Sequence, residues 1–234
     1  MNKSQAFFRK KHTLSVAILS AAMASQSSLA QNAPAIEEIV VFGRNTDLVG
    51  EATSASVGYI GGSDLLIRPL VKTSELLESM PGMVAVQHSG SGKANQYFLR
   101  GFNLDHGTDS TVQLDGVPLN MRTHGHGQGY LDVNGIIPET VEGIDFRKGP
   151  YYADLGDFSM AGASFILTID EVERPCVSVE AGENGWRRYV GGMSQQVNDG
   201  TLSLIGEFKN YDGPWEKGED LGHFSVWGKY LTQT

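Results

Sequence analysis

The final part of the chain, residues 171–234, alternates between apolar and polar side chains with a period of two. The alternation is clearest in the runs 177–181, 202–209 and 224–230. Successive side chains of a strand point to opposite faces of the sheet, so these runs predict three or four antiparallel strands with one apolar face. Transmembrane β-strands show this pattern, and so does a soluble sheet that packs on one side. The alternation alone leaves both interpretations open.

The first thirty residues indicate export. Lys10 and Lys11 stand just before an apolar run, Leu14–Ala24, and Ser28–Ala30 offers the small residues that signal peptidase reads. The run is short for a membrane span, although a single N-terminal anchor remains the alternative. We therefore predict a Sec-type signal peptide over residues 1–30.

The composition favours a folded, β-rich domain that does not bind nucleic acid. Hydrophobic residues make up 40% of the chain and charged residues 19%, which is enough apolar material for a core. The 29 glycines favour a turn-rich fold. The net charge is −9, and a chain this acidic would repel phosphates. The single cysteine, Cys176, excludes an internal disulfide.

The sequence pattern of residues 44–170 predicts a compact α+β domain of short strands and small helices. Ser63 and Thr73 are candidate N-caps of two short helices, and Pro81-Gly82 ends the second. Asp115-Gly116 lies between two apolar triplets, which predicts a tight β-hairpin.

Two glycine-containing loops of this domain, 87–96 and 122–130, are candidates for ligand contact. The side chains of the second loop offer a guanidinium group, imidazole nitrogens, an amide and a phenol on a pliable backbone, which suits the polar floor of a ligand pocket. The candidate ligand-binding residues are Arg122, His124, His126, Gln128 and Tyr130.

His124 and His126 also raise the possibility of direct metal binding. In an extended segment, two histidines separated by one residue lie on the same face and can chelate zinc, nickel or copper. Two ligands make an incomplete site, and His88 and His106 would add to it only if the fold brings them near. The alternative is a solvated or ligand-contacting polar loop.

Ile36–Gly43 is a β-branched run that ends in glycine. Such a segment can add as an extra strand to the exposed edge of another protein's sheet through main-chain hydrogen bonds. The alternative is an ordinary first strand of the domain that follows.

Five fragments follow one another along the chain: Ile36–Gly43, Leu76–Val84, Leu99–Phe102, Leu114–Pro118 and Ile144–Ala163. Their order resembles that of the TonB-dependent receptor family of outer-membrane proteins. The first fragment resembles the TonB box, and the second resembles the family's helix that ends in Pro-Gly-Val. The third and fourth match the Ile-Arg-Gly-Phe and Val-Asp-Gly-Val-Pro elements, and the last resembles the element that closes the plug.

The resemblance implies a fold class and a domain order. The fold would be an α+β plug domain, a short mixed sheet with small helices, followed by the first three or four antiparallel strands of a transmembrane β-barrel. The expected segments are a signal peptide over 1–30, a linker and TonB-box-like segment over 31–43, the plug over 44–170 and the start of the barrel over 171–234. Because the family's barrel has about twenty-two strands, we expect a fragment of a longer protein or a truncated product.

The resemblance also implies energised uptake of a scarce ligand, such as a ferric siderophore or another metal complex, across the cell outer membrane. The expected partners are the periplasmic domain of TonB, the ligand and outer-membrane lipid. TonB would grip Ile36, Glu37, Glu38, Ile39, Val40, Val41, Phe42 and Gly43.

Arg100 and Lys148 resemble the plug's basic residues that pair with glutamates of the barrel. The family often has arginine at the second position. Lysine keeps the charge but loses the bidentate geometry, and the partner glutamates would lie beyond residue 234.

The sequence does not favour an enzyme or a cofactor-binding protein. Gly90–Lys93 resembles part of a phosphate-binding loop, but Gln87 and Ala94 replace the required glycine and hydroxyl residue. The common hydrolase, zinc-protease and dinucleotide motifs do not occur in the sequence. Two alternatives to the receptor remain: a soluble periplasmic binding module whose sheet the last strands complete, and a nonfunctional truncated receptor.

Overall fold

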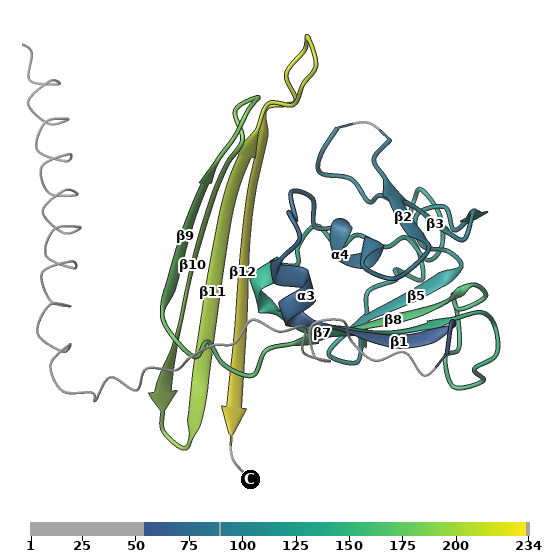
Figure 1. Ribbon diagram of the computed structural model, residues 1–234, viewed down its shortest axis with the longest axis horizontal. Helices are drawn as coiled ribbons and strands as arrows, with labels where there is room; N and C mark the ends of the chain where they lie inside the picture. Colours follow the sequence, from purple (N-terminus) through teal and green to yellow (C-terminus); the bar gives the residue numbers. More distant parts are fainter. Residues whose placement is uncertain (1–53, 89, 233–234) are drawn as a thin grey trace, which may run out of the picture. The chain divides into compact units, whose positions relative to one another are not determined.

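The computed structural model describes residues 54–88 and 90–232, apart from the side chain of Leu66 (Figure 1). The predicted signal peptide and the TonB-box-like segment Ile36–Gly43 therefore lie outside the described residues. Among the residues that are described, no helix is both long and apolar enough to span a membrane.

A five-stranded mixed sheet forms the base of the α+β domain. Its strands are β1 (Val57–Gly61), β5 (Ser110–Leu114), β6 (Val117–Pro118), β7 (Val141–Lys148) and β8 (Gly162–Thr168). The spatial order is β1-β7-β8-β5-β6, and every neighbouring pair is antiparallel except β5 and β8. The strand β1, which the chain enters first, lies at one edge of the sheet.

The predicted hairpin at Asp115-Gly116 is confirmed. Both residues have positive φ angles, 47° and 82°, as a type I′ turn requires, and they join β5 to β6. The Asp115 carboxylate accepts the backbone N–H of Thr168 at 2.8 Å and also its hydroxyl. The turn is thus tied to the end of β8, 53 residues further along the chain.

A second layer contains two short helices and a small sheet. The helices are α3 (Gly62–Leu66) and α4 (Glu75–Glu78), and the antiparallel sheet has the order β2 (Met83–Val86), β3 (Gln96–Leu99) and β4 (Phe102–Asn103). The domain's core combines side chains from both layers. Its largest fully buried members include Leu65, Leu76, Leu77, Met80, Tyr97, Leu104, Leu131, Ile144 and Ile166.

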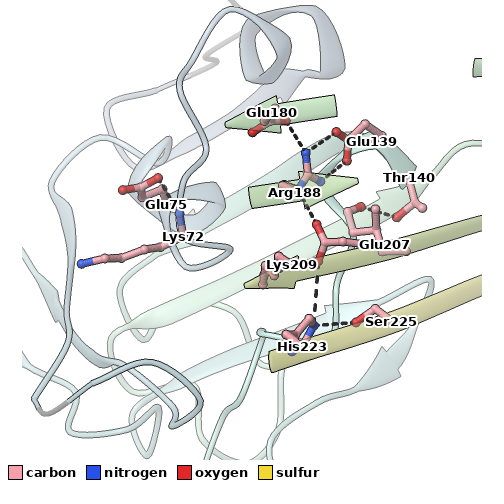
Figure 2. A network of polar contacts seen from close by, with 11 residues as sticks. Lys72, Glu75, Glu139, Thr140, Glu180, Arg188, Glu207, Lys209, His223 and Ser225 are labelled. Carbon is pink, nitrogen blue, oxygen red and sulfur yellow. Dashed lines mark hydrogen bonds and ion pairs between the residues drawn. The ribbon is translucent and has the colours of Figure 1, made fainter. Parts of the chain in front are cut away.

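The predicted helix caps are wrong, although both helices exist. The capping positions are Gly61 and Ser74, and neither makes a side-chain cap hydrogen bond. At the second helix, the Glu75 carboxylate reaches back to the backbone N–H of Lys72 at 3.0 Å and satisfies the free donor there (Figure 2). The hydroxyl of Thr73 is instead buried without a hydrogen-bond partner.

Asn120 lies just after β6 and holds three segments together. Its buried Nδ2 faces the backbone carbonyl oxygens of Gly107 and Ser110 at 3.0 Å and that of Gly129 at 3.1 Å. Its Oδ1 accepts the N–H of Val112 at 2.8 Å. One side-chain amide thereby closes the base of the loop that follows it.

The last third of the described chain forms an antiparallel sheet of four strands in sequential order. They are β9 (Cys176–Ala181), β10 (Arg187–Val197), β11 (Gly200–Tyr211) and β12 (Leu221–Thr232) (Figure 1). The number matches the upper value expected from the alternation.

The two faces of this sheet have the reverse polarity of a soluble sheet. Across it, Val179, Tyr189, Phe208 and Phe224 lie in register and are exposed. The other exposed apolar residues of this face include Val177, Met193, Leu204, Val226 and Tyr230. The opposite face contains the buried polar residues Arg188, Ser203, Glu207, Lys209 and Ser225.

Arg188 of β10 connects the sheet to the α+β domain (Figure 2). Its Nη1 and Nη2 donate to the two carboxylate oxygens of Glu139 at 2.7 and 2.6 Å, a bidentate pair. Glu139 belongs to the short 3₁₀ helix η1 (Pro138–Thr140), which leads into β7. Glu180 of β9 and Glu207 of β11 accept two further bonds, at 2.8 and 2.5 Å.

Glu207 is the most buried acid of this network, with a side chain only 1% exposed. Its Oε1 lies 3.3 Å from Lys209 Nζ and 3.8 Å from His223 Nε2. Beside these charges, Ile137, Val190 and Ile205 form a small apolar cluster with Trp227 at its border. Polar and apolar contacts together hold the four-stranded sheet against the segment around η1.

We predict that Arg188→Ala destabilises the protein by about 3–5 kcal/mol, because Glu207 would remain buried without its strongest partner. Arg188→Lys should recover part of this loss, since lysine keeps the positive charge but lacks the bidentate donor geometry of the guanidinium group. The free energy of unfolding measures both effects. The neighbouring Arg187 is exposed, so Arg187→Ala is the matched control and should change stability by less than about 0.5 kcal/mol. Equal effects of the two alanine substitutions would contradict the network's role.

A second stability prediction concerns Asn120. Asn120→Asp keeps the shape of the side chain but replaces the Nδ2 donor, which faces three carbonyl oxygens, with an acceptor. The free energy of unfolding should therefore fall by about 2–4 kcal/mol. Asn134 donates one exposed bond, to Lys93 O at 2.9 Å, and Asn134→Asp serves as the control. Thermal unfolding of both variants tests the difference, and a tolerated Asn120→Asp would show that the amide is dispensable.

Candidate functional site

The two loops proposed from the sequence, 87–96 and 122–130, lie side by side. The second loop is closed at its base by Met121 and Tyr130, where Met121 N–H donates to Tyr130 O at 2.9 Å. The Tyr130 hydroxyl reaches across and accepts the N–H of Ala94, in the first loop, at 3.1 Å. The fold therefore brings the loops into direct contact.

Four histidines and a tyrosine form a ring cluster between these loops, namely His88, His106, His124, His126 and Tyr130. The His106 ring centre lies 5.1 Å from that of His88 and 4.4 Å from that of His126, the second in an edge-on arrangement. His124 stacks on Tyr130 at 3.9 Å with the two planes 16° apart. The cluster joins residues that are up to 42 positions apart in the sequence.

His106 is the buried member of the cluster, with 7% of its surface exposed. Its Nδ1 lies 3.1 Å from the carbonyl oxygen of Ala94 and 3.0 Å from that of Asn95. Carbonyl oxygens only accept hydrogen bonds, so the proton of the neutral ring sits on Nδ1. The other nitrogen, Nε2, then presents a lone pair.

Asp105 completes a group that can hold a cation. Its Oδ1 lies 3.9 Å from His106 Nε2, and one ligand atom each from Asp105, His106 and His126 all lie within 4.8 Å of one another. The backbone of Asp105 has a φ of 51°, and its N–H donates to Asn103 Oδ1 at 2.8 Å. Asp105 and His126 are exposed, whereas His106 is fixed below them.

The structure separates the five predicted ligand-binding residues into two sets. His124, His126 and Tyr130 belong to the ring cluster. Arg122 is 83% exposed and pairs with Asp157 at 3.2 Å, and the backbone carbonyl of Gln128 accepts the Thr108 hydroxyl at 2.8 Å.

The sequence did not assign Asp105 to the site, and it left His88 and His106 conditional on the fold. The only sequence signal for them was the density of histidines around two glycine-containing loops. The pairing of the loops decides which of these residues meet.

A strand hairpin also reaches the first loop. Glu219, in the turn between β11 and β12, accepts the N–H of Ser91 at 2.7 Å and the indole N–H of Trp215 at 2.8 Å. Burial opposes ionisation of the Glu219 carboxyl, but these donors outweigh it and lower its pKa. The carboxylate form therefore ties the hairpin to the loop.

Arg100 and Lys148 make their described contacts inside the α+β domain. Arg100 Nη2 donates to the carbonyl oxygen of Ala55 at 2.9 Å, and Lys148 Nζ donates to that of Pro81 at 3.1 Å. Burial, and secondarily the charge of Arg100, lower the pKa of Lys148. Their predicted partner glutamates stay a prediction, whereas the acid–base contacts seen with the four-stranded sheet are those of Glu139 with Arg188 and of Asp170 with Lys229.

Comparison with known proteins agrees with this architecture. Residues 50–163 match the model of the family described as TonB-dependent Receptor Plug Domain. The match covers β1 to the start of β8, and with them the ring cluster.

Three solved structures share the fold of this chain at 20–21% identity. One is a mutant of the ferric enterobactin receptor PfeA from Pseudomonas aeruginosa in complex with enterobactin, with a TM-score of 0.53 over 69% of this chain and 26% of that one. The siderophore receptor PirA from Pseudomonas aeruginosa gives 0.52 over 78% and 33%. The copper transporter OprC gives 0.55 over 77% and 28%.

The chain thus spans about a quarter to a third of the length of these proteins. Its mixed sheet with small helices, followed by antiparallel strands in an open sheet, is their arrangement over that length. On the matched residues 50–163, the chain carries the plug domain of the TonB-dependent receptor family.

Proposed function

We propose that this chain is the N-terminal part of an outer-membrane receptor that takes up a scarce ligand with energy delivered by TonB. The observation that carries the proposal is the union of a plug domain with a sheet whose apolar face is exposed. A soluble binding module would bury that face, as water-exposed apolar patches of this size are rare in monomers.

Lipid is the environment that suits the exposed face. The residues that point outward are valine, leucine, methionine and aromatic side chains, and they alternate with polar residues that face the plug. The wall of a transmembrane barrel shows this alternation. Strands with a neighbour on both sides satisfy their main-chain groups through hydrogen bonds to those neighbours, as lipid requires. Further strands would be needed to close the barrel, since β9 and β12 are edges of the described sheet.

The proposed TonB contact is the segment Ile36–Gly43. In the proposed cycle, ligand binding at the loops 87–96 and 122–130 raises the population of receptors in which this segment is released into the periplasm. TonB then adds its own strand to the segment and pulls. Strand pairing gives a grip that depends on the main chain more than on side chains.

The loops 87–96 and 122–130 form the proposed ligand floor, with His124, His126 and Tyr130 in the ring cluster and Arg122 and Gln128 beside it. A ferric siderophore or another metal complex is the proposed cargo. The solved structures with a similar fold support this class of cargo, because they include a ferric enterobactin receptor and a copper transporter.

The membrane assignment is tested at Val226, which lies in the middle of β12 and is 62% exposed. Val226→Arg should cost about 2–4 kcal/mol in lipid and reduce the amount of folded receptor in the outer membrane. Gln195 is exposed near the end of β10, so Gln195→Arg adds the same charge near the membrane surface and should be tolerated. A soluble, fully folded Val226→Arg protein would favour the periplasmic binding module.

The coupling assignment is tested at Val40. Val40→Pro removes a main-chain donor and blocks strand addition, so TonB-dependent uptake should fall to the level of a strain without TonB. Val40→Ile keeps the strand and should transport normally. Protein level and ligand binding at the cell surface should be equal in both variants. Normal uptake by the proline variant would rule out this segment as the TonB contact.

A further inference from the structure

The Asp105–His106–His126 group suggests which chemical class of cargo the plug receives. We propose that these three side chains form a binding site for a borderline divalent transition-metal ion of the zinc type. His126 belongs to the loop 122–130, whereas Asp105 and His106 lie between β4 and β5. The role of the site in transport rests on the proposed uptake function. The binding itself depends only on the geometry of the loops.

The spacing of the three ligand atoms is close to that of a coordinated ion. They lie within 4.8 Å of one another, and metal–ligand bonds of about 2.0–2.2 Å would place them roughly 3–3.5 Å apart. The site must therefore contract by about 1 Å or a little more. Asp105 and His126 are exposed and can make this movement, while the buried His106 provides a fixed point.

The hydrogen bonds of His106 prepare it as a ligand. Its Nδ1–H is directed at the carbonyl oxygens of Ala94 and Asn95, so Nε2 carries the free lone pair on the side of Asp105. Metal-bound histidines commonly donate their second ring N–H to a carbonyl or carboxylate, which fixes the ring and its tautomer. Here this outer contact exists before any ion binds.

A chain of hydrogen bonds orients Asp105 as well. Asn103 Oδ1 accepts the N–H of Asp105 at 2.8 Å and the amide of Gln96 at 3.0 Å, and Gln96 Oε1 in turn contacts His88 Nε2. Asp105 is held in a left-handed backbone conformation by this arrangement. Its carboxylate therefore points toward His106, although the side chain itself is exposed.

The ligand set selects a class of metal. Two imidazole nitrogens and one carboxylate oxygen suit Zn²⁺, Ni²⁺ or Cu²⁺, whereas Mg²⁺ and Ca²⁺ prefer sites made of oxygen alone. Three protein ligands leave at least one position open. A water molecule or a ligand that arrives with the cargo can occupy it, which suits a site that must release its ion.

His124 has a different role in this arrangement. Its Nδ1 accepts the N–H of His126 at 3.2 Å, and its ring stacks on Tyr130. His124 therefore positions the loop that carries His126. The exposed Thr123 in the same loop has no part in the site and offers a matched control.

The test is zinc binding by the intact receptor in detergent, measured by equilibrium dialysis with ZnCl₂ and repeated with NiCl₂, CuCl₂ and MgCl₂. We expect one zinc ion per chain and no competition from magnesium. His126→Ala and Asp105→Asn, both at exposed positions, should each weaken zinc binding by at least about tenfold, and Thr123→Ala should leave it unchanged. X-ray absorption should report two imidazole ligands through the multiple scattering of their rings.

Equal zinc affinity in the unmodified protein and in both site variants would overturn the proposal, as would failure of the zinc, nickel and copper chlorides to bind the unmodified protein. Because binding is measured without TonB, it is separate from uptake. Zinc binding without TonB-dependent zinc accumulation would leave the site standing and count against the proposed transport of its ion.

Discussion

The buried carboxylate of Glu207 is the constraint on which the arrangement of the two sheets depends. A charge on the inward face of a strand is unfavourable unless a partner reaches it, and Arg188 on the next strand does so at 2.5 Å. Arg188 has more donors than Glu207 can accept, and the bidentate pair with Glu139 uses two of them. The remaining donors of Arg188 therefore find these acceptors only when the segment around η1 lies against the strand pair.

This constraint links the polarity of the four-stranded sheet to the plug. The polar residues of β10, β11 and β12 face inward and find partners there, which leaves the apolar residues on the exposed face. Lys229 repeats the principle at the other end of β12, where its Nζ donates to the carbonyl oxygens of Thr168 and Ile169 at 3.2 Å. The plug thus supplies partners for the inward polar side chains of the sheet, and its exposed apolar face suits lipid.

The sequence predicted what is local and missed what depends on distant contacts. Alternation and the Asp115-Gly116 pair identified the strands and the hairpin, because both patterns act within a few residues. The helix caps were wrong. At the second helix, the N–H groups of Glu75 and Leu76, which a cap at Thr73 would accept, donate instead to the backbone carbonyl oxygens of Lys72 and Thr73. The approach of His106 to His126, like that of Glu139 to Arg188, joins segments far apart in the chain, and no spacing rule reveals it.

The position of β1 makes the plug responsive to a pull from its N-terminal side. This strand is the first described strand after the proposed coupling segment, and among the described strands it pairs only with β7, at the edge of the sheet. A force on the preceding residues acts on the bond from Arg100 Nη2 to Ala55 O, at 2.9 Å, and on the bond from Lys148 N–H to Ser56 O, at 2.7 Å, where the β1–β7 pairing begins. Loss of β1 would expose Ile60 to water and weaken the hydrophobic core of the α+β domain. The ring cluster lies in loops outside β1, so a pull would disturb the edge of the plug's sheet before it reaches the proposed ligand site.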